Sequence, residues 1–206
     1  MTDSANSLTE LHREVGRRRI AAGEARTAVL RRRYDAPIED VWEACTDPDR
    51  INRWFLPVTG DLRVGGRFSL EGNASGEILR CEPPRLLAVT WVYSDRPVDE
   101  VELRLSAGAG GGTVLELEHA TVSTKVEWDG QLLDVIPGVG SGWELPLTYS
   151  LPRYLRGELP DAPASEWYEP VPEHMELAER SAEAWAALVA ASEIAGRAGT
   201  GGRDAR

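Results

Sequence analysis

The side chains that could carry acid–base chemistry are few in this chain of 206 residues, and His119 is the best placed of them. It ends a stretch in which apolar and acidic residues alternate, so Leu115, Leu117 and His119 are predicted to share one face of a strand. A histidine on an interior face could orient a ligand carbonyl or transfer a proton near neutral pH. We expect a buried, hydrogen-bonded histidine, and keep the proton shuttle as the weaker catalytic alternative.

No other constellation in the sequence predicts catalysis or a bound metal. His12 and His174 lie in flanking segments without a supporting cluster, and we expect both to be solvated. Cys45 and Cys81 lack the C-x-x-C spacing of zinc and redox sites, so reduced, buried thiols are predicted. The glycine run at residues 108–112 lacks the Lys-Ser/Thr pair of a phosphate-binding loop. We therefore predict no metal and no cofactor.

The charge of the chain argues against a nucleic-acid partner. Its 23 Lys and Arg against 34 Asp and Glu give a formal net charge of -11, which repels phosphate backbones. Arginines crowd the start of the chain and acidic residues its end, so the two ends are expected to attract each other or a second copy. The sequence shows no secretion signal and no run of the roughly 20 apolar residues that span a bilayer. A cytoplasmic protein without membrane insertion is predicted.

The local pattern predicts two short helices and then a series of strands. Residues 25–34 can form a strand, Pro37 suits the first turn of a helix at residues 37–45, and Asp47 caps a second helix that carries Ile51, Trp54 and Phe55. Beyond Pro57 the period changes to two. This change predicts an antiparallel meander, with a hairpin turning at Gly65-Gly66 within residues 61–70 and strands at residues 76–81, 86–93, 98–105 and 113–119.

Helical spacing returns in the last third of the chain. A helix from residue 139 is predicted to carry Trp143, Leu147, Leu151 and Leu155 on one face. Pro146 and Pro152 should kink this helix or cost it about 3 kcal/mol each. A proline-rich connection at residues 160–172 leads to an amphipathic helix at residues 173–195, whose predicted apolar stripe is Met175, Ala178, Ala182, Trp185 and Val189.

The chain is therefore expected to hold one domain with extensions. Residues 1–24 are an N-terminal arm, in which residues 8–22 form at most a marginal helix. Residues 25–157 form the domain, and residues 158–206 form a C-terminal extension. We expect residues 1–7 and 196–206 to be disordered.

Motifs between residues 36 and 143 add a family resemblance. They are APIEDVW at 36–42, TDPDRINRWF at 46–55, GDLRVGGRF at 60–68, GEIL at 76–79, PRLLAVTW at 84–91, GTVLELEH at 112–119 and GSGW at 140–143. Through them the chain resembles the SRPBCC superfamily, and within it the branch related to the C-terminal domain of the activator of Hsp90 ATPase. The resemblance implies an α+β helix-grip fold, a curved antiparallel β-sheet wrapped around a long helix, here with an extra C-terminal helix. Ligand carriers, polyketide cyclases and co-chaperone-like domains all belong to that superfamily.

A helix laid across a concave sheet leaves room for an apolar pocket. The lining predicted from strand alternation and helix faces is Trp54, Phe55, Phe68, Leu70, Ile78, Val89, Trp91, Val101, Leu103, Leu115, Leu117, His119, Trp143 and Leu147. The first hypothesis is a non-enzymatic protein that binds a small hydrophobic molecule there. The alternatives are a polyketide cyclase-like or hydrolase-like enzyme that uses His119, and a protein-binding module with a chaperone partner. A homodimer is compatible with each of them.

Overall fold

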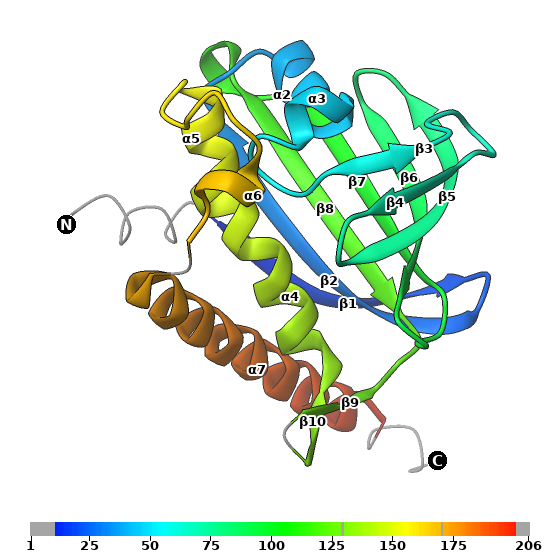
Figure 1. The fold of residues 1–206 in the computed structure, drawn as a ribbon. Coiled ribbons are helices and arrows are strands. Elements are labelled where there is room, and N and C mark those ends of the chain that lie inside the picture. Colours follow the sequence, from blue (N-terminus) through cyan, green and yellow to red (C-terminus); the bar gives the residue numbers. More distant parts are fainter. Residues whose placement is uncertain (1–10, 129, 170, 201–206) are drawn as a thin grey trace.

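The computed structural model describes residues 11–128, 130–169 and 171–200, and the described part contains an eight-stranded antiparallel sheet (Figure 1). The strand order is β1-β2-β8-β7-β6-β5-β4-β3. The strands are β1 (His12–Ile20), β2 (Gly23–Tyr34), β3 (Val58–Gly60), β4 (Arg67–Leu70), β5 (Ala74–Glu82), β6 (Leu86–Tyr93), β7 (Asp99–Ala107) and β8 (Thr113–Thr121). A separate hairpin consists of β9 (Lys125–Trp128) and β10 (Gln131–Asp134).

Helices cover the concave face of the sheet and one another. The helical elements are α2 (Ile38–Thr46), α3 (Pro48–Ile51), the 3-10 turn η1 (Ala109–Gly111), α4 (Val135–Leu145), the π-helical turn η2 (Pro146–Ser150), α5 (Leu151–Leu155), α6 (Ala164–Trp167) and α7 (Pro172–Thr200). In Figure 1, α4 crosses the sheet over β2, and α7 lies against α4 and the edge strand β1. The predicted α+β helix-grip fold with an extra C-terminal helix is confirmed.

The prediction of a marginal helix at residues 8–22 was wrong. Within this segment, residues His12–Ile20 form β1, which pairs with β2 along its whole length, from His12↔Arg31 to Ile20↔Gly23. A two-residue turn joins the strands, with Gly23 at φ +132°. Arginines on both faces of β1 hide the period-two pattern, so sequence spacing gave no strand signal. The residues predicted to be disordered at 1–7 lie outside the described residues, as do residues 201–206. The same prediction was wrong for residues 196–200, where the backbone continues helix α7 (Pro172–Thr200).

Other elements differ from the prediction in detail. The chain does not turn at a Gly65-Gly66 hairpin: β3 and β4 pair with each other, and residues 61–66 connect them. The β9–β10 hairpin was not predicted, and α4 begins at Val135, not at residue 139. On α7 the predicted stripe is partly wrong, because Met175 is 59% exposed while His174, expected to be solvated, is 6% exposed.

The elements α4, η2 and α5 follow one another as a continuous helical segment, which includes a π-turn. Pro146 and Pro152 lie at the starts of η2 and α5 within this segment. In the π-turn the Leu151 N–H binds the Pro146 carbonyl, five residues back, and Pro152 has no N–H to donate to a helical carbonyl. Strand β2 supplies donors to two carbonyls of this segment. Tyr34 Oη donates to the Leu147 carbonyl at 2.7 Å, and Arg32 Nη1 donates to the Thr148 carbonyl at 3.2 Å. The sheet thereby binds the irregular part of the helix directly.

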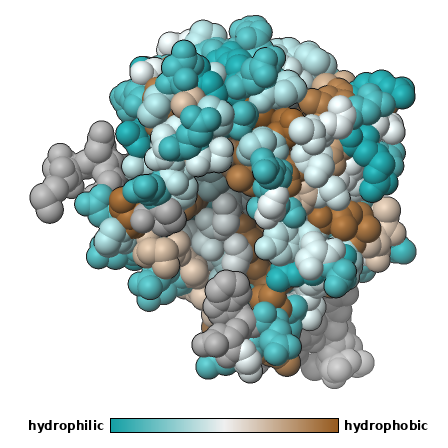
Figure 2. All heavy atoms as spheres, in the orientation of Figure 1, coloured by the Kyte–Doolittle hydropathy of each residue, from teal (hydrophilic) through white to brown (hydrophobic). Residues whose placement is uncertain are grey.

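Apolar side chains on the outside are dispersed. On the face in Figure 2, hydrophilic side chains cover most of the region over α2 and α3, and hydrophobic residues show as small patches between them. Within the described residues, no helix combines the length and the apolar character needed to cross a membrane.

Close packing between α4 and α7 depends on one glycine. Gly140 of α4 is buried, and a Cβ atom placed on it would lie 2.3 Å from the ring of Trp185 on α7. Trp185 itself has no exposed surface. Gly138, two residues earlier in the same helix, is exposed and has nothing within 4 Å of such a Cβ.

We expect Gly140→Ala to destabilise the protein by about 1 to 3 kcal/mol, because the added methyl group overpacks the α4–α7 contact. Gly138→Ala is the matched control and should be neutral or stabilising by up to about 1 kcal/mol, since alanine is the better helix former. Urea unfolding of both variants measures the difference. Equal stabilities would contradict the packing described for α7.

Candidate functional site

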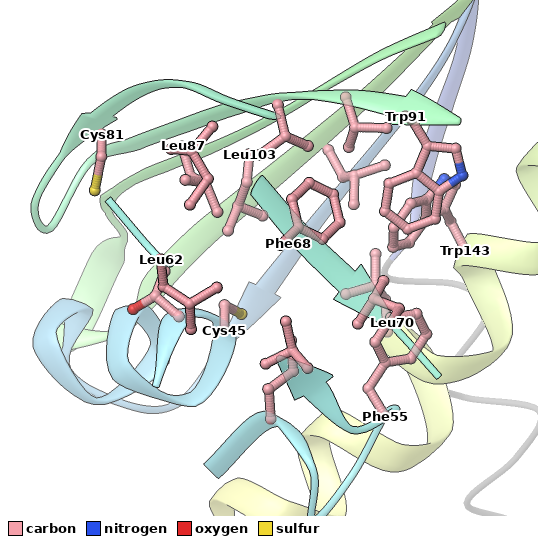
Figure 3. A pocket seen from close by; sticks show the side chains of 18 of the residues that line it. Cys45, Phe55, Leu62, Phe68, Leu70, Cys81, Leu87, Trp91, Leu103 and Trp143 are labelled. Atoms are coloured by element: carbon pink, nitrogen blue, oxygen red, sulfur yellow. The ribbon is translucent and has the colours of Figure 1, made fainter. Parts of the chain in front are cut away.

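A cavity of about 180 Å³ lies between the concave face of the sheet and the helices that cover it (Figure 3). For comparison, an engineered apolar cavity of about 150 Å³ holds a benzene molecule. Strands β3 to β8, with the β3–β4 connection, form one wall, and α2, α3 with the turn after it, α4 and η2 form the other. The cavity is lined by Cys45, Thr46, Ile51, Trp54, Phe55, Val58, Leu62, Phe68, Leu70, Ile78, Cys81, Leu87, Val89, Trp91, Val101, Leu103, Leu117, Trp143 and Leu147.

The structure brings most of the predicted lining together and leaves two residues out. Leu115 is fully buried in the core away from the cavity wall, and His119 lies behind the wall. The remaining predicted residues, Trp54, Phe55, Phe68, Leu70, Ile78, Val89, Trp91, Val101, Leu103, Leu117, Trp143 and Leu147, all line the cavity.

Sequence reasoning missed the residues near the mouth of the cavity. Cys81 joins the wall because a bulge in β5 between Ile78 and Arg80 shifts the alternation by one residue. Nothing in the sequence marks that bulge. Leu62 lies in the β3–β4 connection, which was predicted as a strand, and it is 39% exposed. In Figure 3, Leu62 and Cys81 lie toward one end of the cavity, and Trp91 and Trp143 lie at the other.

Aromatic rings close the inner end. Phe55 stacks on Trp143 with 5.8 Å between ring centroids and 26° between planes, and Trp143 meets Trp91 at 4.9 Å. Phe68 adds a further contact with Trp91 at 6.3 Å. Such tilted and stacked pairs are favourable geometries for aromatic rings. The inner end is therefore a set of large apolar surfaces that a flat guest could contact.

His119 supports this aromatic end and has both ring nitrogens engaged. Trp143 Nε1 donates to His119 Nδ1 at 2.9 Å, so Nδ1 must be the unprotonated acceptor. The proton therefore resides on His119 Nε2, which donates to Asp99 Oδ2 at 3.0 Å. Asp99 Oδ1 is buried without a hydrogen-bond partner among the described residues. The expected buried, hydrogen-bonded histidine is confirmed, with Trp143 and Asp99 as its partners.

The polar side chains of the wall have little to offer a reaction. The Thr46 hydroxyl donates to the Trp42 carbonyl at 2.8 Å, which occupies its proton. The prediction of buried thiols holds for Cys45 but was wrong for Cys81, which is exposed. Burial raises the pKa of the Cys45 thiol to about 12, and partial desolvation also raises the pKa of Cys81, so both are thiols at neutral pH. Within the described residues, no group of three or more His, Cys, Asp or Glu is placed to hold a metal ion.

A second polar cluster, which sequence reasoning missed, lies on the other side of α4. The Glu144 carboxylate has no exposed surface and accepts from Arg13 Nε at 2.8 Å and from Arg13 Nη2 at 2.5 Å. Ser181 Oγ donates to it at 2.8 Å and Trp185 Nε1 at 3.1 Å. The cluster joins β1, α4 and α7. A single acidic residue in the apolar run GWELPL was the signal in the sequence, because a lone carboxylate there must either face water or find buried donors.

Comparison with protein families matches residues 35–156 to the family described as Activator of Hsp90 ATPase homolog 1-like protein. That segment contains α2 to α5 and β3 to β10. Strands β1 and β2 and helices α6 and α7 lie outside it. No curated protein matches the chain.

Solved structures resemble the chain over a longer range. CalU16 from Micromonospora echinospora is 52% identical, with a TM-score of 0.74 over 87% of this chain and 98% of that one. DynU16, described as a putative protein in the dynemicin biosynthetic locus, is 24% identical, with a TM-score of 0.55 over 66% of this chain and 49% of that one. PFC0360w, described as an HSP90 activator from Plasmodium falciparum, is 20% identical, with a TM-score of 0.53 over 65% of this chain and 97% of that one. The last two likenesses show a shared fold alone.

Replacing His119 should cost stability. In His119→Ala the Asp99 carboxylate and the Trp143 indole both lose their partners, and we expect a loss of about 3 kcal/mol or more, as for other broken buried pairs. His119→Gln keeps an amide donor and should recover part of the loss. Urea unfolding measures both variants. Stabilities equal to wild type would show that the Asp99–His119–Trp143 chain does not hold the inner end of the cavity.

The two thiols should differ in reactivity. We expect iodoacetamide to alkylate exposed Cys81 in the native protein, with a rate that rises about tenfold per pH unit from pH 6 to 8, because the thiolate fraction grows in that proportion well below the pKa, which is raised at Cys81. Cys45 should react only after unfolding, since it is buried and its pKa is about 12. Peptide mapping by mass spectrometry distinguishes the two positions. Native labelling of Cys45 at the Cys81 rate would contradict the burial described for it.

Proposed function

The chain belongs to the family of Activator of Hsp90 ATPase homolog 1-like proteins, and from this premise we propose that it binds a small hydrophobic molecule in the cavity between the sheet and α4, without catalysing a reaction on it. The observation that carries the proposal is an unfilled cavity of about 180 Å³ with an almost entirely apolar wall. Binding pockets for small molecules have this character, a mostly apolar concavity with few polar groups.

The size of the cavity limits the guest. A molecule of one or two fused rings suits about 180 Å³, and a larger one must leave part of itself outside. The end beside Leu62 and Cys81 offers the exit, because both residues line the cavity and are exposed to solvent. The opposite end offers the faces of Trp91 and Trp143. An aromatic or alicyclic group would therefore occupy the inner end, with any extension directed toward the mouth.

The alternative of a polyketide cyclase-like or hydrolase-like enzyme has less support. It needs a proton shuttle at the cavity wall, but His119 is not part of that wall and both its nitrogens are engaged. The thiols of Cys45 and Cys81 are protonated at neutral pH, which makes them weak nucleophiles. Binding without a reaction requires neither a proton shuttle nor a reactive nucleophile in the cavity wall.

A chaperone partner, a homodimer and the cytoplasmic location stay predictions. The likeness to the HSP90 activator PFC0360w is one of fold, at 20% identity, and fold does not decide function. Affinity capture with purified Hsp90 tests the first, and light scattering of the purified chain tests the second.

Ligand binding can be tested by thermal shift and native mass spectrometry with lipids, polyketides, aromatic metabolites and the probe naphthalene. A bound guest at one hundred times its Kd stabilises the folded state by about 2.7 kcal/mol. For a chain of this size that corresponds to a rise in Tm of about 5 to 11 °C. Absence of any response across the series would overturn the proposal.

A cavity-filling variant makes the test specific to the site. Leu103 projects from β7 into the cavity (Figure 3), so Leu103→Trp should occupy the space and abolish the response to naphthalene. Leu103→Met, which nearly conserves volume, is the matched control and should keep it. Circular dichroism shows whether both variants are folded. Equal binding by the two variants would place the guest elsewhere on the protein.

A further inference from the structure

We propose that Glu144 is a positioning residue for the cavity: by joining α4 to β1 and α7, it holds Trp143 in the cavity wall. The inference rests on the proposed function, since it concerns the shape of the same site. It also assigns a task to the segments outside the matched residues 35–156, because Arg13 of β1 and Ser181 and Trp185 of α7 supply the donors to Glu144.

Helix α4 needs such an anchor because its composition is poor for a helix. Its 11 residues include Gly138, Gly140 and Gly142, with Pro137 in the first turn and Pro146 directly after the end. Glycine is the weakest helix former after proline. In a chain of this composition, contacts with the rest of the protein must fix where the helix lies and how it is rotated.

Two successive residues of α4 connect the cavity to the outer layer. Trp143 turns into the cavity, where it donates to His119 and stacks on Phe55. Glu144 is rotated from it by about 100° on the helix, and its carboxylate receives Arg13, Ser181 and Trp185 on the side of β1 and α7. A change in the position of Glu144 must therefore move Trp143, because one peptide bond joins them.

The contacts of α4 with β1 and α7 allow little change in direction or distance. The Arg13 guanidinium reaches both oxygens of the carboxylate, which sets direction as well as distance. The ring of Trp185 lies against Gly140 one turn earlier, where no larger residue fits. Together these contacts fix both the rotation of α4 and its separation from α7. Because Trp143 of the same helix forms part of the cavity wall, these contacts also set where that wall lies.

The test compares two arginines of the same strand. Arg13→Met removes the charged partner of Glu144, whereas Arg18→Met removes a partly buried arginine that pairs with Glu100 and Glu118 on the outer face of the sheet. Glu144→Gln is the direct variant. Ser181→Ala, which removes one donor only, serves if Glu144→Gln does not fold.

Two measurements are made on each full-length variant. The first is the indole N–H resonance of Trp143 in a proton–nitrogen correlation spectrum, assigned through Trp143→Phe. The second is the Kd of naphthalene. We expect Arg13→Met and Glu144→Gln to shift the Trp143 resonance and to weaken naphthalene binding by about five- to tenfold. Arg18→Met should leave the resonance in place and the Kd within about twofold of wild type.

The inference is overturned if Arg13→Met and Glu144→Gln, or Ser181→Ala in its place, lower Tm but leave the Trp143 resonance and the Kd unchanged. That result would give Glu144 a structural role only. The failure of the proposed function has a different signature: wild-type protein then binds neither naphthalene nor the other compounds. In that case the Trp143 resonance still decides whether Glu144 positions the wall.

Discussion

The carboxylate of Glu144 has no contact with water, and the joining of the layers in this protein depends on how that charge is stabilised. Burying an ion costs several kcal/mol, which is recovered only when the geometry is good and the remaining lone pairs are satisfied. Arg13, Ser181 and Trp185 meet both conditions from two other elements. Movement of β1 away from α4 would leave a charge unpaired in the interior, and movement of α7 would remove two hydrogen bonds from the same carboxylate. The sheet, helix α4 and helix α7 therefore behave as one unit.

This anchoring explains how an unfilled cavity can persist. Protein interiors are otherwise close-packed, and by analogy with truncated cores a void of about 180 Å³ costs about 4 kcal/mol. That is a large share of the 5 to 15 kcal/mol by which most domains are stable. Here α4 is held from outside, through Glu144 and through the fit of Gly140 against Trp185, and from its end by Tyr34 and Arg32 of β2. The helix need not collapse onto the sheet to be stable.

What the sequence could predict follows from local rules. Asp47 caps α3 as expected, accepting from Asp49 N and Arg50 N at 3.0 Å, and strand alternation placed most of the cavity wall. Tertiary interactions decided the rest. Strand β1 was missed because Arg13 points inward to Glu144, which no local pattern shows. The apolar stripe of α7 was misread because Ser181, a polar residue, is buried against the same carboxylate.

Two of the features that sequence reasoning missed, strand β1 and the buried face of α7, lie outside the residues that match the family. The matched residues 35–156 contain both cavity walls, whereas Arg13 and α7 lie outside them. The family match thus includes Glu144 but not Arg13, Ser181 and Trp185, which donate to its carboxylate. Under the proposal made for Glu144, β1 and α7 influence the shape of the cavity through the position of α4. A likeness of fold therefore does not carry over the whole anchor of α4, because Glu144 lies inside the matched residues whereas its donors Arg13, Ser181 and Trp185 lie outside them.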